Sequence, residues 1–176
     1  ETIVEAAENL KSEPLTWIII GDGRKRNWLE REIRKRKLQG TIHLLGHKPV
    51  QNMPYYFSSA DVLLVTLRSH PVMSSWIPGK VQSYLASAKP IIGALDGAGA
   101  SVIDESGAGF SVKAGDSSAL SKKVLQLSKM SEHARVEMGK SALNYYNEEF
   151  NRKKLVSNLE KYFFNLTKKG SKELSS

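Results

Sequence analysis

The residues best suited to chemistry lie in the segment PGKVQSYLASAKP (residues 78–90), which precedes the apolar run IIGAL. This pattern predicts a loop, a helix with its proline at the first helical position, a tight turn and a buried strand. Ile77 has no side-chain oxygen to cap that helix, so the N–H groups of Gly79, Lys80 and Val81 would lack partners. Free donors, a helix dipole and a lysine in the first turn suit a phosphate. The alternative is an ordinary surface helix before a strand.

The same helix has two kinds of position. Those at core spacing are Val81, Tyr84, Leu85 and Ala88, and a second face carries Lys80, Ser83 and Ser87. The Ser83 hydroxyl would lie one turn beyond Lys80, where it could reach a phosphate.

The order of the expected elements indicates the fold class. Apolar strands are expected at residues 17–20, 41–45, 61–65, 91–95 and 110–112. Helices are expected around them at about residues 3–10, 27–40, 53–60, 78–88, 98–106, 116–129, 131–149 and 151–167, with a long loop at 67–77. Continuous apolar strands joined by helices predict an α/β fold: a single doubly wound parallel sheet of five or more strands, with helices on both faces.

Polar residues mark where several helices should begin. Asn27 with Glu30 three residues later resembles a capping box, and the last three helices open on Asp116, Ser131 and Asn151. Ligands of open parallel sheets bind beyond the C-terminal ends of the strands. The segments that follow the strands (residues 21–24, 46–52, 67–79 and 96–100) should therefore meet at one edge and form a nucleotide-type site.

Composition bounds the class of protein. The 176 residues suffice for one domain, expected over residues 1–167, with a polar, flexible tail at 168–176. The absence of cysteine excludes disulfides, thiolate metal sites and a cysteine nucleophile. None of the four histidines forms a metal-ligand pair at helical spacing, so we predict no metal. We also expect no cofactor. With no apolar run of membrane-spanning length and no signal peptide, we expect a cytoplasmic protein.

The net charge of +8 is concentrated in one segment. Its basic residues are Arg24, Lys25, Arg26, Arg31, Arg34, Lys35, Arg36 and Lys37. We interpret them first as a solvated helix face and second as a surface for an anionic membrane, at its inner face. We expect no nucleic-acid partner, because aromatic residues are not interleaved for base stacking.

Several classes of catalytic site are not supported. The sequence has no G-x-S-x-G elbow, no Walker A loop and no recognisable pair of carboxylates for glycoside hydrolysis. The contribution that remains for this domain is to position a substrate and to stabilise charge, rather than to act as an acid or a base.

Five motifs in order carry a resemblance to a family. These are WIIIGDGRKRNWLE, IHLLGHKPVQNMPYYFSSADVLLV, PGKVQSYLASAKP, IIGALDGAGA and SVIDESGAGFSVKAGDSSALSKKV. Over residues 1 to about 165 the chain resembles the C-terminal, donor-binding domain of the large retaining glycosyltransferase family (group 1, family 4) of GT-B architecture. It is most similar to the branch that builds bacterial surface polysaccharides. The resemblance implies a Rossmann-like domain that binds a nucleotide-diphosphate sugar, as donor substrate rather than cofactor.

The resemblance also implies site residues. In the family, the active site is a cleft between this domain and an acceptor-binding domain. GDGR would face that cleft, GHKPV would contact the nucleotide base, and the start of the Pro78 helix would face the diphosphate. The substrate-binding residues expected on this basis are Gly21, Gly23, Arg24, His47, Pro49, Val50, Gly79, Lys80, Val81 and Ser83. No catalytic residue is assigned. Asp116 matches an Asp that caps a helix in the family, which is a structural role.

The chain departs from the family pattern at two acids. Most relatives carry a Glu at the position of Ser83, for the ribose, and another eight residues earlier, where Ser75 stands. The Asp96-Gly97-Ala98-Gly99 loop also lacks the usual acid.

The family's C-terminal domain normally begins with a strand, a Gly-Arg turn and a Lys-Gly pair, and an acceptor-binding domain precedes it. We expect these parts to precede Glu1 in a longer enzyme, and we expect residues 1–176 alone to be inactive. Two alternatives stay open: a half-domain of a sugar-nucleotide epimerase, and a non-catalytic doubly wound binding module.

Overall fold

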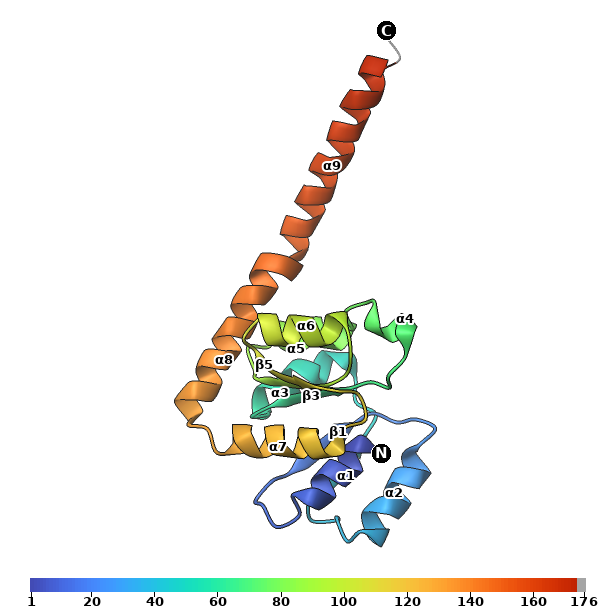
Figure 1. Ribbon diagram of the computed structural model, residues 1–176, viewed down its shortest axis with the longest axis vertical. Helices are drawn as coiled ribbons and strands as arrows, with labels where there is room; N and C mark the ends of the chain where they lie inside the picture. Colours follow the sequence, from blue (N-terminus) through green and yellow to red (C-terminus); the bar gives the residue numbers. More distant parts are fainter. Residues whose placement is uncertain (174–176) are drawn as a thin grey trace.

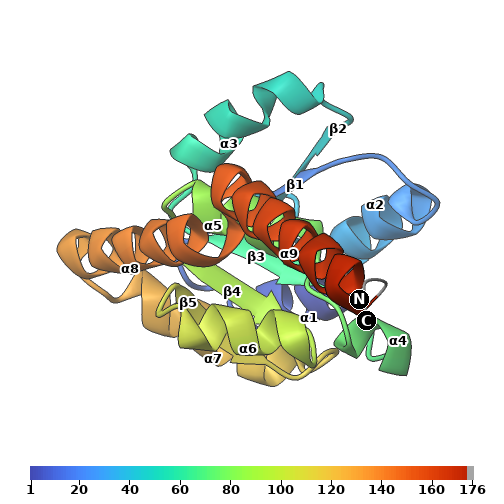
Figure 2. The same cartoon turned by 90° about the horizontal axis from the view of Figure 1, so that it is seen from above.

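Helices and parallel strands form three layers in the computed structural model, which describes residues 1–173 and the side chains of residues 1–166 (Figures 1 and 2). The strands are β1 (Trp17–Ile20), β2 (Ile42–Gly46), β3 (Leu63–Thr66), β4 (Ile91–Ala94) and β5 (Gly109–Val112). The helices are α1 (Thr2–Asn9), α2 (Arg26–Lys35), α3 (Met53–Ser59), α4 (Pro71–Ser74), α5 (Gly79–Ala86), α6 (Ala98–Glu105), α7 (Ser117–Ser128), α8 (Glu132–Tyr145) and α9 (Arg152–Glu173). A 3-10 turn at Val50–Asn52 precedes α3, and a π-helical segment at Tyr146–Phe150 joins α8 to α9.

All strand pairs are parallel, as the sequence predicts, but the expectation of a single sheet is wrong. β1 pairs only with β2, whereas β3, β4 and β5 form a second group with β4 in the middle. β1 and β3 do not pair with each other, so each is an edge strand of its own group.

Two apolar cores hold these strands in one body. The first joins α1 and α7 to residues of both strand groups, including Trp17, Ile42 and Ile92. The second lies on the other face of β3–β5, under α5, α6 and α8. All four residues of β4 are buried, which is expected of a central parallel strand with helices on both faces.

Most predicted elements are confirmed, with local corrections. Asp116 and Ser131 cap α7 and α8 as predicted. The Asn27 capping box is wrong: α2 begins at Arg26 after Lys25, without a side-chain cap. Residues 67–77 are not all loop, since α4 forms where His70 Nδ1 accepts a hydrogen bond from Val72 N–H.

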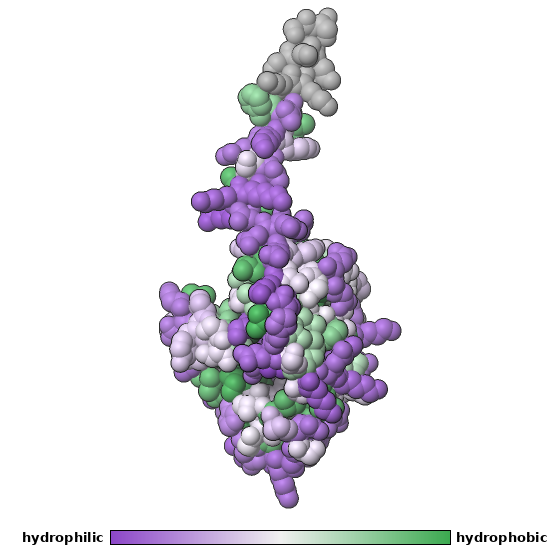
Figure 3. Space-filling view, turned by 90° about the vertical axis from the view of Figure 1, so that its left-hand side faces the viewer, coloured by the Kyte–Doolittle hydropathy of each residue, from purple (hydrophilic) through white to green (hydrophobic). Residues whose placement is uncertain are grey.

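The last helix projects away from the body, as Figure 1 shows. Figure 3 shows mostly hydrophilic side chains on the face of the helix turned toward the viewer, whereas the hydrophobic side chains of Leu155, Leu159 and Phe163 are about half exposed. The helix continues past Thr167 to Glu173, and residues 174–176 of the expected tail lie outside the described residues. No helix in the described part of the chain is long and apolar enough to span a membrane.

Gly139 provides a test of how α8 packs on α5. A Cβ at this position would overlap the carbonyl oxygen of Ala88, just after α5. We therefore expect Gly139→Ala to lower the free energy of unfolding by about 1–3 kcal/mol, although Gly→Ala inside a helix ordinarily stabilises it. Gly79→Ala is the control, because a Cβ there meets nothing within 4 Å. Urea unfolding of both variants is the measurement, and equal effects would contradict the packing.

Candidate functional site

The start of α5 lacks a side-chain cap, as the sequence predicts. Pro78 is the N-cap residue in an extended conformation, rather than the first helical residue, and no side chain bonds the helix start. Gly79 and Lys80 are exposed. The expectation of three free donors is wrong for Val81, whose N–H donates to Pro78 C=O at 2.9 Å because the first turn is tight. The donors that face outward here are therefore those of Gly79 and Lys80.

The two faces of α5 are arranged as the spacing predicts for residues 79–86, but the prediction is wrong for Ser87 and Ala88, because the helix ends at Ala86 and Ala88 has φ +54°. Val81 and Leu85 are fully buried, and the Tyr84 ring packs edge-on against Phe57 with centroids 5.2 Å apart. Burial raises the pKa of the Tyr84 phenol above its usual value. Ser83 is exposed, and its hydroxyl donates to Gly79 C=O at 3.0 Å. Ser83 thus offers an outside ligand an acceptor oxygen rather than a donor.

A carboxylate ties together the segments that follow three strands. Asp96, after β4, accepts a hydrogen bond from the Ser69 side chain, after β3. It also accepts one from Ala114 N–H at 3.1 Å, after β5. These bonds, with a smaller contribution from the charge of Lys113, hold the pKa of Asp96 below its usual value. Hydrogen bonds to Asp96 therefore connect the segments at the edge that α5 faces.

Two glycines bring α4, α5 and α6 into direct contact at this edge. Gly97 has φ +75°, and a Cβ there would overlap the main chain of Ser74 at the end of α4. A Cβ on Gly99 would lie 2.8 Å from Cδ of Pro78. The Gly-rich segment identified in the sequence therefore serves close packing, which positions the start of α5 beside the start of α6.

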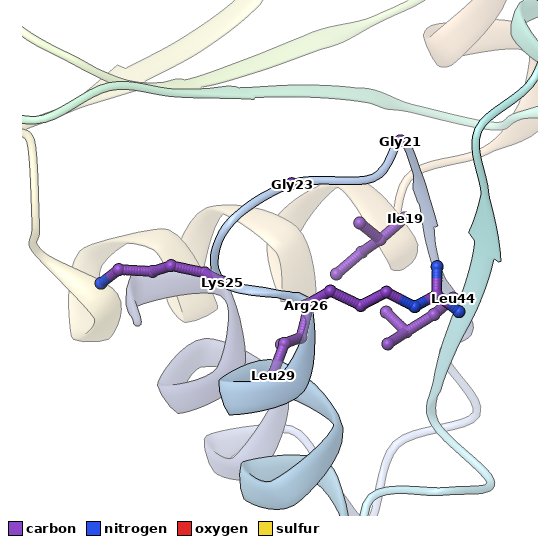
Figure 4. Close-up of a pocket in the computed structure, with 7 residues that line it drawn as sticks. All are labelled: Ile19, Gly21, Gly23, Lys25, Arg26, Leu29 and Leu44. Atoms are coloured by element: carbon purple, nitrogen blue, oxygen red, sulfur yellow. The ribbon is translucent and has the colours of Figure 1, made fainter.

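A shallow pocket of about 180 Å³ lies at the C-terminal end of β1. Its lining residues are Ile19, Gly21, Gly23, Lys25, Arg26, Leu29 and Leu44. Arg26 points across the pocket toward Leu44, whereas Lys25 points away (Figure 4). The Arg26 guanidinium bonds Glu30 at 3.0 Å and lies 4.0 Å from Asp22. Apolar side chains thus form the floor, and an arginine forms one wall.

The predicted residues fall into two groups on this edge of the molecule. Gly21 and Gly23 line the pocket, and the α5 group comprises Gly79, Lys80 and Ser83. Arg24 is exposed and does not line the pocket. The residues predicted after β2, namely His47, Pro49 and Val50, are all exposed.

Arg26 lines the pocket but is not among the site residues that the motifs predict. Its i,i+4 spacing to Glu30 was a usable signal for a fixed side chain on the first turn of α2. Within the described residues, no group of three or more His, Asp or Glu side chains could hold a metal ion.

The chain belongs to the glycosyl transferases group 1, since the family pattern matches residues 1–130. Its fold is one half of the GT-B architecture. No curated protein matches the sequence significantly.

Solved structures share the fold at low identity. A Staphylococcus aureus TarM mutant in complex with UDP matches with a TM-score of 0.78 at 16% identity, over 92% of this chain and 32% of TarM. Anabaena HepE in complex with UDP-glucose matches with a TM-score of 0.73 at 16% identity, over 90% of this chain and 44% of HepE. The C-terminal domain of the Francisella tularensis group 1 protein LpcC matches with a TM-score of 0.71 at 18% identity, over 86% of this chain and 78% of that domain. The chain thus spans less than half of TarM and HepE.

The Asp96 tether predicts a pH dependence of stability. Because the folded-state pKa is lowered, the ionised carboxylate stabilises the fold above the unfolded pKa of about 3.9 and loses this effect as pH falls through the folded value. We expect Asp96→Ala to be less stable than wild type at pH 7, with the difference shrinking below about pH 4. Thermal unfolding from pH 3 to 7 measures this. Asp61→Ala, which removes an exposed carboxylate, is the control, and a difference that persists at pH 3 would refute the tether.

Proposed function

We propose that this chain is the donor-binding half of a glycosyltransferase that moves a sugar from a nucleotide-diphosphate sugar to a glycan or a lipid-linked acceptor in polysaccharide biosynthesis. Membership of glycosyl transferases group 1 supports the class of reaction. The relatives that hold UDP or UDP-glucose support a nucleotide-sugar donor.

The observation that carries the proposal is the start of α5. It has no side-chain cap and no acidic residue in its first turn, and Lys80 is exposed within that turn. It follows β3, at the edge where open parallel sheets bind ligands. The diphosphate would accept hydrogen bonds from the N–H groups of Gly79 and Lys80 and pair with the Lys80 ammonium.

The expected role of this half in catalysis is electrostatic. When the bond between sugar and diphosphate breaks, negative charge develops on the leaving oxygen. The helix dipole and Lys80 would stabilise that charge without a proton transfer from this domain. Gly21, Gly23 and the Arg26 side chain would stand beside the donor, at the pocket between β1 and α2.

The acceptor would come to a second domain of a longer polypeptide, as the share of TarM and HepE that this chain covers suggests. Residues 1–176 by themselves would then bind a donor without transferring its sugar. We place the complete enzyme in the cytoplasm.

Replacing Lys80 tests the diphosphate site. We expect Lys80→Ala in the full-length protein to weaken UDP binding by about 1–3 kcal/mol, or about 5–150-fold, since a charge-assisted hydrogen bond is lost. Calorimetric titration with UDP-, GDP- and TDP-sugars and the free diphosphates measures it. Lys80 lies off the buried face of α5, so thermal unfolding should be unchanged.

The matched control is Lys122→Ala, which removes an exposed lysine from α7. It should leave both affinity and stability unchanged. Unchanged UDP affinity in a well-folded Lys80→Ala protein would reject the site. Equal losses of UDP affinity in both variants would show a general effect of positive charge rather than a specific site.

We also propose that the basic segment at residues 24–37 attracts the inner face of an anionic membrane. Part of its charge is neutralised, because Lys25, Arg26 and Arg36 form ion pairs. Arg31, Arg34 and Lys35 remain exposed on α2. Each basic residue near such a surface contributes about 1 kcal/mol.

The membrane proposal predicts salt-sensitive binding to vesicles. The full-length protein should sediment with anionic vesicles at low salt, less so at high salt, and not with neutral vesicles. Replacing Arg31, Arg34 and Lys35 by Gln should abolish most of this binding. Equal sedimentation with both vesicle types would remove the idea.

A further inference from the structure

The segment that joins β3 to α5 presents apolar side chains to solvent at the edge that carries the candidate site. Val72 is 66% exposed, Trp76 is 50% exposed and Met73 is 39% exposed. Figures 1 and 2 show α4, which carries two of these residues, at the margin of the body beside α6. Single exposed apolar residues are common in proteins, but three within five residues at a ligand-binding edge indicate a contact with something outside the fold.

The main chain on both sides of Trp76 is held in place. Ser74 and Pro78 lie so close to the two glycines at the start of α6 that a Cβ on either glycine would overlap them. Ile77 packs against the core under α5 and α6. Trp76 therefore lies between two fixed points of the segment, and its position does not depend on a bound ligand.

The hydroxyl groups next to Trp76 are already used within the segment. Ser74 Oγ donates a hydrogen bond to His70 C=O at 3.1 Å, and Ser75 Oγ donates one to Val72 C=O at 2.9 Å. The sequence also has no Asp or Glu from residue 62 to residue 95. A sugar placed here would therefore find no carboxylate of this segment or of α5 to accept its hydroxyl protons.

Trp76 lies within reach of a sugar that is attached to the proposed diphosphate. It is three residues from Gly79, so the two Cα atoms are at most about 11 Å apart. In a nucleotide sugar, the sugar is joined directly to the diphosphate that the start of α5 would hold. An aromatic ring offers such a sugar a flat apolar surface, which suits carbon-bound hydrogens rather than hydroxyl groups.

We propose that Trp76, with Met73 beside it, contacts the donor sugar and selects a hexose in which an apolar group replaces one hydroxyl, either the methyl of an acetamido group or a deoxy carbon. This inference rests on the proposed nucleotide-sugar donor and adds the class of sugar. An apolar group loses contact with water when it packs on the indole ring, which is favourable. A hydroxyl at the same place would lose its hydrogen bonds to water without a replacement, which is costly.

Matched nucleotide sugars test the selection. Calorimetric titration of the full-length protein compares UDP-glucose with UDP-N-acetylglucosamine and with UDP-6-deoxyglucose, each of which differs from UDP-glucose at one substituent. We expect one of these two to bind about tenfold more tightly than UDP-glucose, the scale of one added apolar group in a binding site. The sugar that is preferred shows whether the apolar group is acetamido or deoxy.

Variants at Trp76 connect the preference to the indole ring. Trp76→Ala should remove the preference between sugars and leave the affinity for UDP itself unchanged, because UDP carries no sugar at the diphosphate end. Trp76→Phe should keep most of the preference, since it keeps an aromatic face. Val136→Ala is the control, because it shortens a half-exposed apolar side chain on α8, and it should keep the full preference.

The outcomes separate this inference from the proposed function. Equal affinity of the wild-type protein for all three sugars, or a preference that survives in Trp76→Ala, overturns the inference while UDP binding still supports the nucleotide site. An equal loss of affinity for UDP and for the UDP-sugars in Trp76→Ala would place the ring against the nucleotide and would also overturn it. A wild-type protein that does not bind UDP rejects the UDP site itself, and this inference with it.

Discussion

The parallel pairing of β4 between β3 and β5 is the constraint on which the rest of the fold depends. A strand with parallel neighbours on both sides needs crossover connections, and these connections place helices on both faces. All four residues of β4 are accordingly buried, under α7 on one side and under α5 and α6 on the other. The same pairing brings the segments after β3, β4 and β5 to one edge. There the hydrogen bonds of Asp96 connect them.

Much of the fold could be predicted because its signals are local. The apolar runs at Trp17–Ile20 and Ile91–Ala94 fix two strands, and Asp116 and Ser131 cap the helices that they precede. The break between β1 and β3 could not be predicted from the sequence. It depends on which strands become neighbours, and the sequence of an apolar strand does not determine its pairing partner. Helix α4 was missed for a related reason: its cap is a histidine, and its place is determined by the glycine packed under Ser74.

The candidate site was predicted in kind but not in detail. The type and spacing of Pro78, Gly79 and Lys80 suffice to indicate an uncapped helix start. They do not reveal that Val81 N–H turns back to Pro78, or that Ser83 donates its proton to Gly79. Both are consequences of how tightly the first turn winds. Arg26 was overlooked among its basic neighbours because only the fold separates the one that lines a pocket from those that face solvent.

The electrostatics of this edge follow from the absence of acids where the family usually has them. With serines at positions 75 and 83, no carboxylate stands in α5 or at the end of the segment before it. The nearby carboxylate of Asp96 accepts hydrogen bonds from the Ser69 side chain and from Ala114 N–H, and Lys113 lies beside it. α6, which begins beside Pro78, also lacks a side-chain cap and an acidic first turn. Two helix dipoles therefore present their positive ends at one edge, where the ionised Asp96 carboxylate has the cationic Lys113 beside it. An anion brought there would gain from both dipoles, and this is the electrostatic argument for the proposed diphosphate site.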